Sequence, residues 1–316
     1  MKRITNKPKK TMKKSRAVKP PRSLISIKDL SKQEIESIIA LAVKIKKHPK
    51  KYQSKLKGKV LLMLFAKPSL RTHLSFEVAM YQLGGHPIYY SLAESVLGKK
   101  ESIKDAAKVM ARYVNIIMAR LFEHKEMEEL SKYSNVPVIN HASVPVISGL
   151  DNYEHPCQVL GDLLTIKEKK KKLTGLTITY IGDGNNNVTN SLIYACDKLN
   201  IHLQIICPEQ YKPKIPGNYS LSHNPEDAKG DILYTDTWFS YHVPESEHEE
   251  RKKVLQDYQV TKHLLKNALF MHCLPAQRGM EVTDEVMDSK QSIIYDQAEN
   301  RLFIQKAILL WCLGKS

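Results

Sequence analysis

The sequence predicts an α/β protein built from two doubly wound parallel-sheet domains joined by helices. Two largely apolar runs have the length of strands, at residues 60–65 and 176–181. The first run, VLLMLF, has no polar residue, which is typical of a strand buried on both faces of a parallel sheet. A segment with helical spacing of apolar residues follows each run, and this β-α repeat favours a parallel sheet. The chain has 316 residues, enough for two such domains.

The first domain is expected at residues 24–154. Its helices are predicted at residues 26–46, 69–84, 102–113 and 126–133, and its strands at residues 60–65, 88–90, 115–121 and 136–139. Gly84-Gly85 ends the second of these helices, because glycine readily adopts the left-handed conformation that follows a helix.

The second domain is expected at residues 155–300. Its helices are predicted at residues 155–168, which link the two domains, and 188–199, and its strands at residues 176–181, 202–207, 232–235, 269–272 and 293–295. A final helix at about 305–313, within a C-terminal segment 301–316, is expected to pack back on the first domain.

The positive charge is concentrated at the N-terminus. Residues 1–22 contain ten Lys or Arg and no acidic residue, so the net charge of +16 falls to +6 without them. This basic tail, residues 1–23, is expected to be disordered. A solubility tail, an organelle transit peptide and a nucleic-acid-binding arm all fit its composition.

Five widely spaced cysteines form no C-x-x-C pair, which argues against a disulfide framework or a zinc ribbon. No apolar run is long enough to span a bilayer. We therefore expect a protein of a reducing compartment, in the cytoplasm, or in the mitochondrion or another organelle if the tail is a transit peptide. We expect no membrane partner, and nucleic-acid binding only through the tail.

The most informative segment is Ser69-Leu70-Arg71-Thr72, which opens a predicted helix beyond the end of strand 60–65. Helix N-termini bind phosphate because their first N–H groups lack partners and the dipole is positive there. Arg71 adds a forked donor suited to phosphate oxygens. The same residues also fit a simple Ser N-cap followed by a surface arginine.

Further polar residues stand at predicted strand ends, where open α/β sheets bind ligands. Arg120 ends an apolar strand, either for an anionic ligand or for a salt bridge. His155 and Gln158 share one helix face, with Pro156 at the first helical position. Arg301 lies near the last predicted strand.

A second group of residues suits an amino-acid ligand. The run Gly182–Asn187 (GDGNNN) lacks the third glycine of a dinucleotide loop, and its run of asparagines better suits a carboxylate or an amine. Asp236 ends a strand and either binds an ammonium group or caps a helix. His272-Cys273-Leu274-Pro275 follows another strand. We expect no Cys273 thiolate nucleophile, because neighbouring residues on an extended segment point to opposite faces.

Together these residues resemble the aspartate/ornithine carbamoyltransferase family, and more specifically its ornithine branch. The resemblance covers about residues 24–314. Its motifs, in family order, are SLRT at 69–72, LGKKES at 97–102, MAR at 118–120, HPCQ at 155–158, GD with the Asn run from 182, Asp236 with Ser240, HCLP at 272–275, EVTDEV at 281–286 and QAENR at 297–301.

The resemblance implies a carbamoyl phosphate-binding first domain and an amino-acid-binding second domain. The carbamoyl phosphate ligands would be Ser69, Leu70, Arg71, Thr72, Arg120, His155, Gln158, Cys273, Leu274 and Arg301. The amino-acid ligands would be Asn186, Asn187, Asp236, Ser240 and Tyr241. Thr72, Arg120, His155 and Cys273 would be the catalytic set.

The implied reaction transfers the carbamoyl group of carbamoyl phosphate to the side-chain amine of L-ornithine and yields citrulline and phosphate, in arginine metabolism. Neither a metal nor an organic cofactor is needed. The resemblance also implies a homotrimer with active sites between subunits.

The chain departs from the family pattern at three places, which involve four residues. Tyr241-His242 replaces Met-Gly in the loop after Asp236, His73 replaces an arginine, and Val96 replaces a polar residue that reaches a neighbouring subunit. The altered loop leaves two other hypotheses open. One is a carbamoyltransferase for another amine, such as putrescine or an N-acylated ornithine, and the other is a family member that has lost catalysis and acts as a binding protein.

Overall fold

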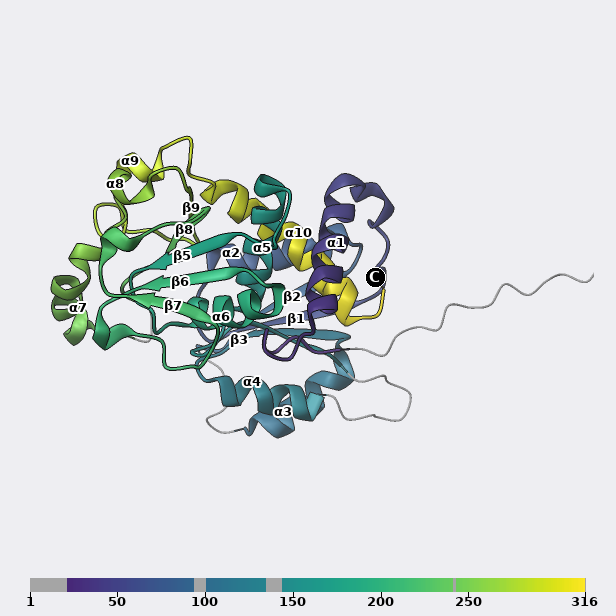
Figure 1. Ribbon diagram of the computed structural model, residues 1–316. Coiled ribbons are helices and arrows are strands. Elements are labelled where there is room, and N and C mark those ends of the chain that lie inside the picture. The colour runs from purple at the N-terminus through teal and green to yellow at the C-terminus, as the bar shows by residue number, and fades with distance from the viewer. Residues whose placement is uncertain (1–21, 94–100, 135–143, 241–242, 316) are drawn as a thin grey trace, which may run out of the picture.

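The computed structural model describes residues 22–93, 101–134, 144–240 and 243–315, and two sheets organise them (Figure 1). The strands of the first sheet, in spatial order, are β2 (His86–Ser91), β1 (Val60–Phe65), β3 (Ile116–Arg120) and β4 (Val146–Leu150). Those of the second are β7 (Tyr219–Ser222), β6 (His202–Ile206), β5 (Thr177–Ile181), β8 (Ile232–Thr235) and β9 (Leu269–His272). Neighbouring strands in both sheets are parallel. The predicted fold class is therefore confirmed.

Helices pack on both sheets. They are α1 (Lys32–Lys47), α2 (Leu70–Gln82), α3 (Ile103–Tyr113), α4 (His124–Ser134), α5 (Pro156–Lys170), α6 (Asn187–Leu199), α7 (His248–Leu255), α8 (Lys262–Leu265), α9 (Asp284–Met287) and α10 (Ile294–Cys312). Helices α3 and α4 cover the lower face of the first sheet in Figure 1. No described helix is both long and apolar enough to cross a membrane.

One hydrophobic core joins the two domains. Alternate residues of β1 point to opposite faces: Leu62 and Leu64 pack against α3 and α4, whereas Met63 and Phe65 face the shared core. That core also contains residues of α1, α5, α6, α10 and the second sheet. The site residues on α2, α5 and α10 are consequently held by one packed unit.

The turn after α2 depends on glycine, as predicted. Gly84 has φ +84°, and a Cβ atom there would lie 2.5 Å from the carbonyl oxygen of Gln53. Any larger residue would require both a left-handed backbone and movement of that loop.

Several predicted elements differ from the structure. The predicted strand 293–295 is wrong: Ile294 and Tyr295 open α10, and only Ser292 forms an isolated bridge, with Phe270. Arg301 therefore lies inside a helix. Helix α1 begins at Lys32 rather than near residue 26, because Ser31 and Glu34 form a capping box. β4, β7, α7, α8 and α9 were not predicted, and the predicted strand 136–139 lies outside the described residues.

Candidate active site

A cavity of about 400 Å³ lies where the carboxyl ends of the two sheets face each other. It is lined by Pro68, Ser69, Leu70, Arg71, Thr72, Arg120, Leu150, His155, Gln158, Asn187, Val188, Asp236, Thr237, Phe239, Ser240, Cys273, Leu274, Pro275, Gln277 and Arg301. All predicted site residues but two line it. Asn186 does not, and Tyr241 lies outside the described part of the chain.

The N-terminus of α2 opens into this cavity. Ser69 is its N-cap, and the Ser69 hydroxyl accepts a hydrogen bond from the Thr72 N–H at 3.4 Å. The cap and the predicted phosphate site are therefore the same structure, because the cap fixes the first turn while Leu70 and Arg71 line the cavity.

Arg301 reaches the cavity from α10 and links the two helices that open there. Its guanidinium donates to Gln158 Oε1 on α5 and, at 3.4 Å, to Thr72 Oγ1 on α2. The side chain is almost completely buried. Burial without an ion pair is costly for a guanidinium, so an anionic ligand in the cavity would stabilise it.

His155 is kept neutral by its surroundings. Burial, and then the positive charges of Arg301, Arg120 and Arg71, hold the pKa of this imidazole well below its usual value. Its backbone N–H donates to Ser191 Oγ at 2.9 Å, which fixes the residue before α5. The buried Nδ1 has no hydrogen-bond partner among the described residues. A ligand atom could therefore bond with this ring nitrogen.

Asp162, a buried residue that does not line the cavity, positions the side chain of Gln158. Its carboxylate accepts from Gln158 Nε2 at 2.8 Å, Gln297 Nε2 at 2.8 Å and the Tyr234 hydroxyl at 3.0 Å. Burial raises its pKa to about 6, although these hydrogen bonds act in the opposite direction. Both ends of the Gln158 amide are thus engaged, one by Asp162 and the other by Arg301.

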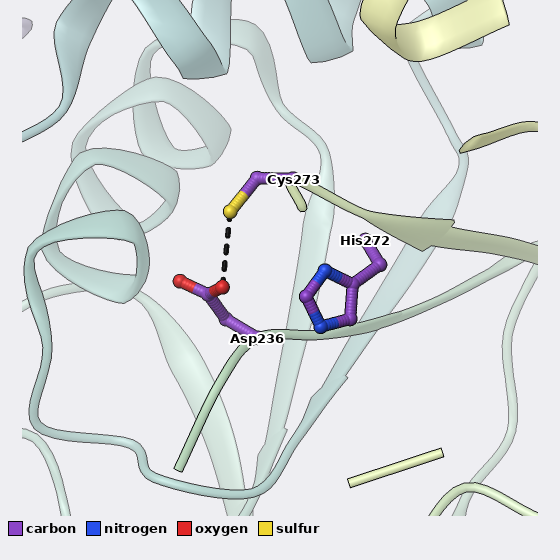
Figure 2. A group of neighbouring side chains, drawn as sticks. All are labelled: Asp236, His272 and Cys273. Atoms are coloured by element: carbon purple, nitrogen blue, oxygen red, sulfur yellow. Dashed lines mark hydrogen bonds between the residues drawn. The ribbon is translucent and has the colours of Figure 1, made fainter. Parts of the chain in front are cut away.

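The opposite wall carries a buried carboxylate. Figure 2 shows Asp236 at the end of β8 and Cys273 just after β9, with the Cys273 thiol donating to Asp236 Oδ1 at 3.0 Å. Burial raises the pKa of Asp236, and burial and Asp236 raise the pKa of Cys273 well above its usual value. Cys273 is therefore a neutral thiol, which agrees with the expectation that it is not a thiolate nucleophile.

Asp236, His272 and Cys273 also present ligand atoms within 4.8 Å of one another, the spacing of a metal site. Their hydrogen bonds argue against that use. His272 Nδ1 accepts from the Leu274 N–H at 2.9 Å, so Nε2 carries the proton and donates to Glu281 at 3.1 Å. Neither ring nitrogen is available to a metal in this arrangement, and the thiol is protonated.

These hydrogen bonds instead hold an unusual backbone conformation. Leu274 has φ +61°, in the left-handed region, which costs a residue with a side chain about 1–3 kcal/mol. Its N–H is anchored by His272, which is itself anchored by the fully buried Glu281. The chain thereby places Leu274 and Pro275 in the cavity wall.

The two asparagines have different roles. Asn187 lines the cavity, and its Nδ2 donates to the Asp151 carbonyl at 2.8 Å. Asn186 differs from the prediction, because its side chain is the N-cap of α6: Oδ1 accepts from the Thr189 N–H at 2.9 Å, and Nδ2 donates to Tyr180 and to the Asp183 carbonyl. Its whole amide is therefore bonded within the protein.

A buried ion pair that the sequence did not indicate supports this wall. Arg251 of α7 pairs with Asp183 and donates through Nε to the Trp238 carbonyl at 3.1 Å. Its guanidinium also lies 4.4 Å from the centre of the Tyr211 ring. Asp183 follows β5 and Trp238 follows β8, so one side chain fixes both loops that carry the amino-acid-side residues.

Sequence reasoning also missed cavity residues. Thr237, Phe239 and Gln277 line the cavity but belong to no motif singled out above. In the sequence, only their closeness to Asp236 and to Leu274-Pro275 indicates that these three residues could line the site. The ring of Phe239 stacks on His248, with centroids 4.2 Å apart.

Three guanidinium groups and a neutral imidazole on one wall face a buried carboxylate on the other, an arrangement that suits an anionic ligand group beside a cationic one. The comparisons with known proteins identify the protein further. Residues 22–168 match the family model for the aspartate/ornithine carbamoyltransferase carbamoyl-P binding domain, and residues 174–312 match the model for the Asp/Orn binding domain. The chain belongs to the aspartate/ornithine carbamoyltransferase family.

Its relatives bear the name of one branch. The chain is 44% identical over 314 residues to an ornithine carbamoyltransferase of Thermococcus kodakarensis, covering 93% of this chain and 96% of that one. It is 46% identical over 309 residues to one of Archaeoglobus fulgidus, covering 92% and 97%. The solved structure of the Pyrococcus furiosus enzyme superimposes with a TM-score of 0.86 at 43% identity, covering 94% of this chain and 98% of that one.

Proposed function

We propose that this protein transfers the carbamoyl group of carbamoyl phosphate to the side-chain amine of L-ornithine, giving L-citrulline and phosphate. The observation that carries the proposal is one cavity with Arg71, Arg120, Arg301 and neutral His155 on one side and Asp236 on the other. The names of the relatives support ornithine as the second substrate. One of them, from Pyrococcus furiosus, is called anabolic, which supports a role in arginine biosynthesis.

Carbamoyl phosphate occupies the first-domain side in this proposal. The N–H groups of the first turn of α2 and the guanidinium groups of Arg71 and Arg301 bind the phosphate oxygens. Arg120 and His155 donate to the carbonyl oxygen. Gln158 lies in the same cavity, and its side-chain orientation is fixed by the hydrogen bond to Asp162. Because His155 is neutral, it donates one hydrogen bond without adding a further positive charge to the site.

Ornithine occupies the second-domain side. Asp236 pairs with its α-ammonium group, because the side-chain amine must be uncharged to react. Ser240 and Asn187 complete the amino-acid site. The buried Asp236 is costly to ionise alone, so a bound ammonium group favours its charged form.

The reaction proceeds by attack of the uncharged amine. Its lone pair forms the C–N bond, and the carbonyl π electrons move to oxygen, where Thr72, Arg120 and His155 stabilise the negative charge. When the C=O bond re-forms, the C–O bond to phosphate breaks and phosphate leaves with its electron pair. The departing phosphate accepts the surplus proton from nitrogen. Fixing both substrates in one cavity supplies the entropic part of the rate increase.

We also propose that the protein is a homotrimer. Apolar side chains are exposed near one another on α2 and on β2, the edge strand of the first sheet: Leu70, Leu74 and Tyr89, whose ring stacks on His73 of α2. We call this surface the α2–β2 face. Clustered exposed apolar residues are typical of subunit contacts. Sedimentation of the purified protein tests this, and a concentration-independent monomer would contradict it.

Turnover with carbamoyl phosphate and a panel of amines tests the reaction. The panel is ornithine, putrescine, N-acetylornithine, lysine and aspartate, and both phosphate release and the ureido product are measured. We expect clear turnover with ornithine. Turnover with another amine alone would support the alternative based on Tyr241-His242, and no turnover with any of them would contradict the catalytic proposal.

A further inference from the structure

A second cavity, of about 510 Å³, lies at the other end of α2 from the active site. Its walls come from three segments: the end of α1, the loop after it, and the end of α2, with α10 behind. The residues that matter here are Ile45, Tyr52, Tyr81, Gln82, Leu83 and Lys306. We call it the Lys306 cavity.

Lys306 is the unusual member of this cavity. Only 4% of the residue is exposed, and its Nζ donates to the neutral Gln82 amide and lies 5.0 Å from the centre of the Phe303 ring. Among the described residues, no carboxylate forms a salt bridge with it. Burial lowers its pKa, because a desolvated ammonium group is less stable than the neutral amine.

Lys46 gives a comparison within the same part of the molecule. This lysine also lies beside Phe303, at 5.1 Å from the ring centre, but it pairs with Glu168 at 3.2 Å and Glu299 at 2.9 Å. These two carboxylates raise its pKa despite burial. Within the described part of the chain, Lys306 has no negatively charged partner of the kind that Lys46 has.

The surroundings favour an anion. Eight lysines lie between residues 44 and 59, whereas residues 37–76 contain no Asp or Glu. Most of these lysines are exposed around the segment that forms the cavity wall. An approaching anion is therefore attracted to this region before it meets Lys306.

The remaining wall is apolar and aromatic. Ile45 and Leu83 are buried, and the Tyr52 and Tyr81 rings stand beside them. Purely inorganic anions would leave this surface without a partner. Pockets that combine an apolar wall with one charged group usually bind small organic molecules.

We propose that the Lys306 cavity is a binding site for a small organic anion. The charged group of the ligand pairs with Lys306, and its apolar body packs against Ile45, Tyr52 and Leu83. This site is separate from the active site and does not depend on the proposed reaction.

A fluorescent organic anion, 2-naphthoate, tests the proposal by titration of the purified full-length protein. We expect saturable binding that weakens about tenfold or more in Lys306→Met, because a charge-assisted contact is lost. The uncharged probe 2-naphthalenemethanol should bind at least about tenfold more weakly than 2-naphthoate for the same reason. Gln53 is an exposed lining residue, so the indole of Gln53→Trp should occupy part of the cavity while Lys306 stays in place, and binding should again be lost.

Two control variants identify where the probe binds. Lys47→Met removes an exposed lysine from the same region, and Arg120→Ala removes a cation from the active site; both should bind 2-naphthoate as the wild type does. Equal binding by Lys306→Met and wild type would overturn the proposal. So would an equal loss in Lys47→Met, which indicates diffuse attraction, or loss in Arg120→Ala, which indicates binding in the active site. Circular dichroism confirms that each variant is folded.

Discussion

The two walls of the active site are built in different ways. The first-domain wall consists of helix ends and a strand end: Ser69 caps α2, Arg120 ends β3, and Arg301 of α10 connects α2 to α5. The second-domain wall consists of loops after β5, β8 and β9, held by the Arg251–Asp183 pair and by the bond between Cys273 and Asp236. The wall for the phosphorylated substrate is thus part of the core, whereas the wall for the amine depends on a few polar cross-links.

This difference suggests how the family could vary. A wall fixed by the shared core tolerates little change, so the carbamoyl phosphate side is expected to stay constant. A wall made of loops accepts new residues without disturbing that core. If the two walls are independent, a substitution in one should leave binding at the other unchanged.

Arg120→Ala should lower kcat by about 10²–10³-fold, because it removes a donor to the developing oxyanion. Steady-state turnover with ornithine measures this. The matched control is Arg112→Ala, an exposed arginine on α3, which should behave as the wild type. A kcat within threefold of wild type for Arg120→Ala would mean that the cationic wall does not stabilise the transition state.

Asp162→Asn should change how stability depends on pH. The pKa of Asp162 is raised to about 6 in the folded protein, so the unfolded chain ionises it more readily. Protonated Asp162 therefore stabilises the folded protein, and this stabilisation is fully present below pH 3.8, the usual pKa of the group. It is lost as the pH rises through about 6, and the loss in the free energy of unfolding is about 3 kcal/mol at pH 7.5. The loss of stability between pH 4.5 and pH 7.5 should therefore be smaller in the variant.

Urea unfolding at the two pH values measures this difference. Asp197→Asn, which changes an exposed carboxylate on α6, is the control for the substitution itself. Equal pH dependence in the wild type and Asp162→Asn would show that Asp162 does not titrate in this range.

Arg251→Gln should raise the KM for ornithine about tenfold, which corresponds to roughly 1.4 kcal/mol, and leave the KM for carbamoyl phosphate within twofold. Arg251 is a positioning residue, because it holds the loops after β5 and β8 and does not line the cavity. The neighbouring exposed Lys252→Gln is the control. Equal increases in both KM values would show that the two walls are not independent.

Cys273→Ser should lower kcat less than tenfold, because serine keeps a donor for Asp236 and the thiol is not a thiolate. The measurement is kcat over pH 6–9. A thousandfold loss would instead indicate that Cys273 takes part in the chemistry as a nucleophile.

The sequence predicted the first wall better than the second, for a physical reason. The α2 site lies in one contiguous motif, where a strand, a cap and a helix start follow one another within a few residues. The second wall depends on contacts between distant residues. Arg251 and Asp183 are 68 positions apart, and an arginine in the highly charged α7 segment looks like an ordinary surface residue.

The asparagine run shows a second limit. Nothing in GDGNNN distinguishes the residue that caps α6 from the one that faces the cavity, because all three side chains are the same. The two roles fall on neighbouring positions: Asn186 caps α6, and Asn187 lines the cavity. Similarly, the apolar residues at 293–295 fit a short strand as well as the start of α10, and this short pattern does not distinguish the two.

The most direct test of this account is a crystal structure with carbamoyl phosphate and norvaline, which is ornithine without its reactive amine. We predict phosphate oxygens on Arg71 and Arg301, the carbonyl oxygen on Arg120 and His155, and the α-ammonium group of norvaline on Asp236. Norvaline bound among the arginines, or phosphate bound beside Asp236, would contradict the assignment of the two walls.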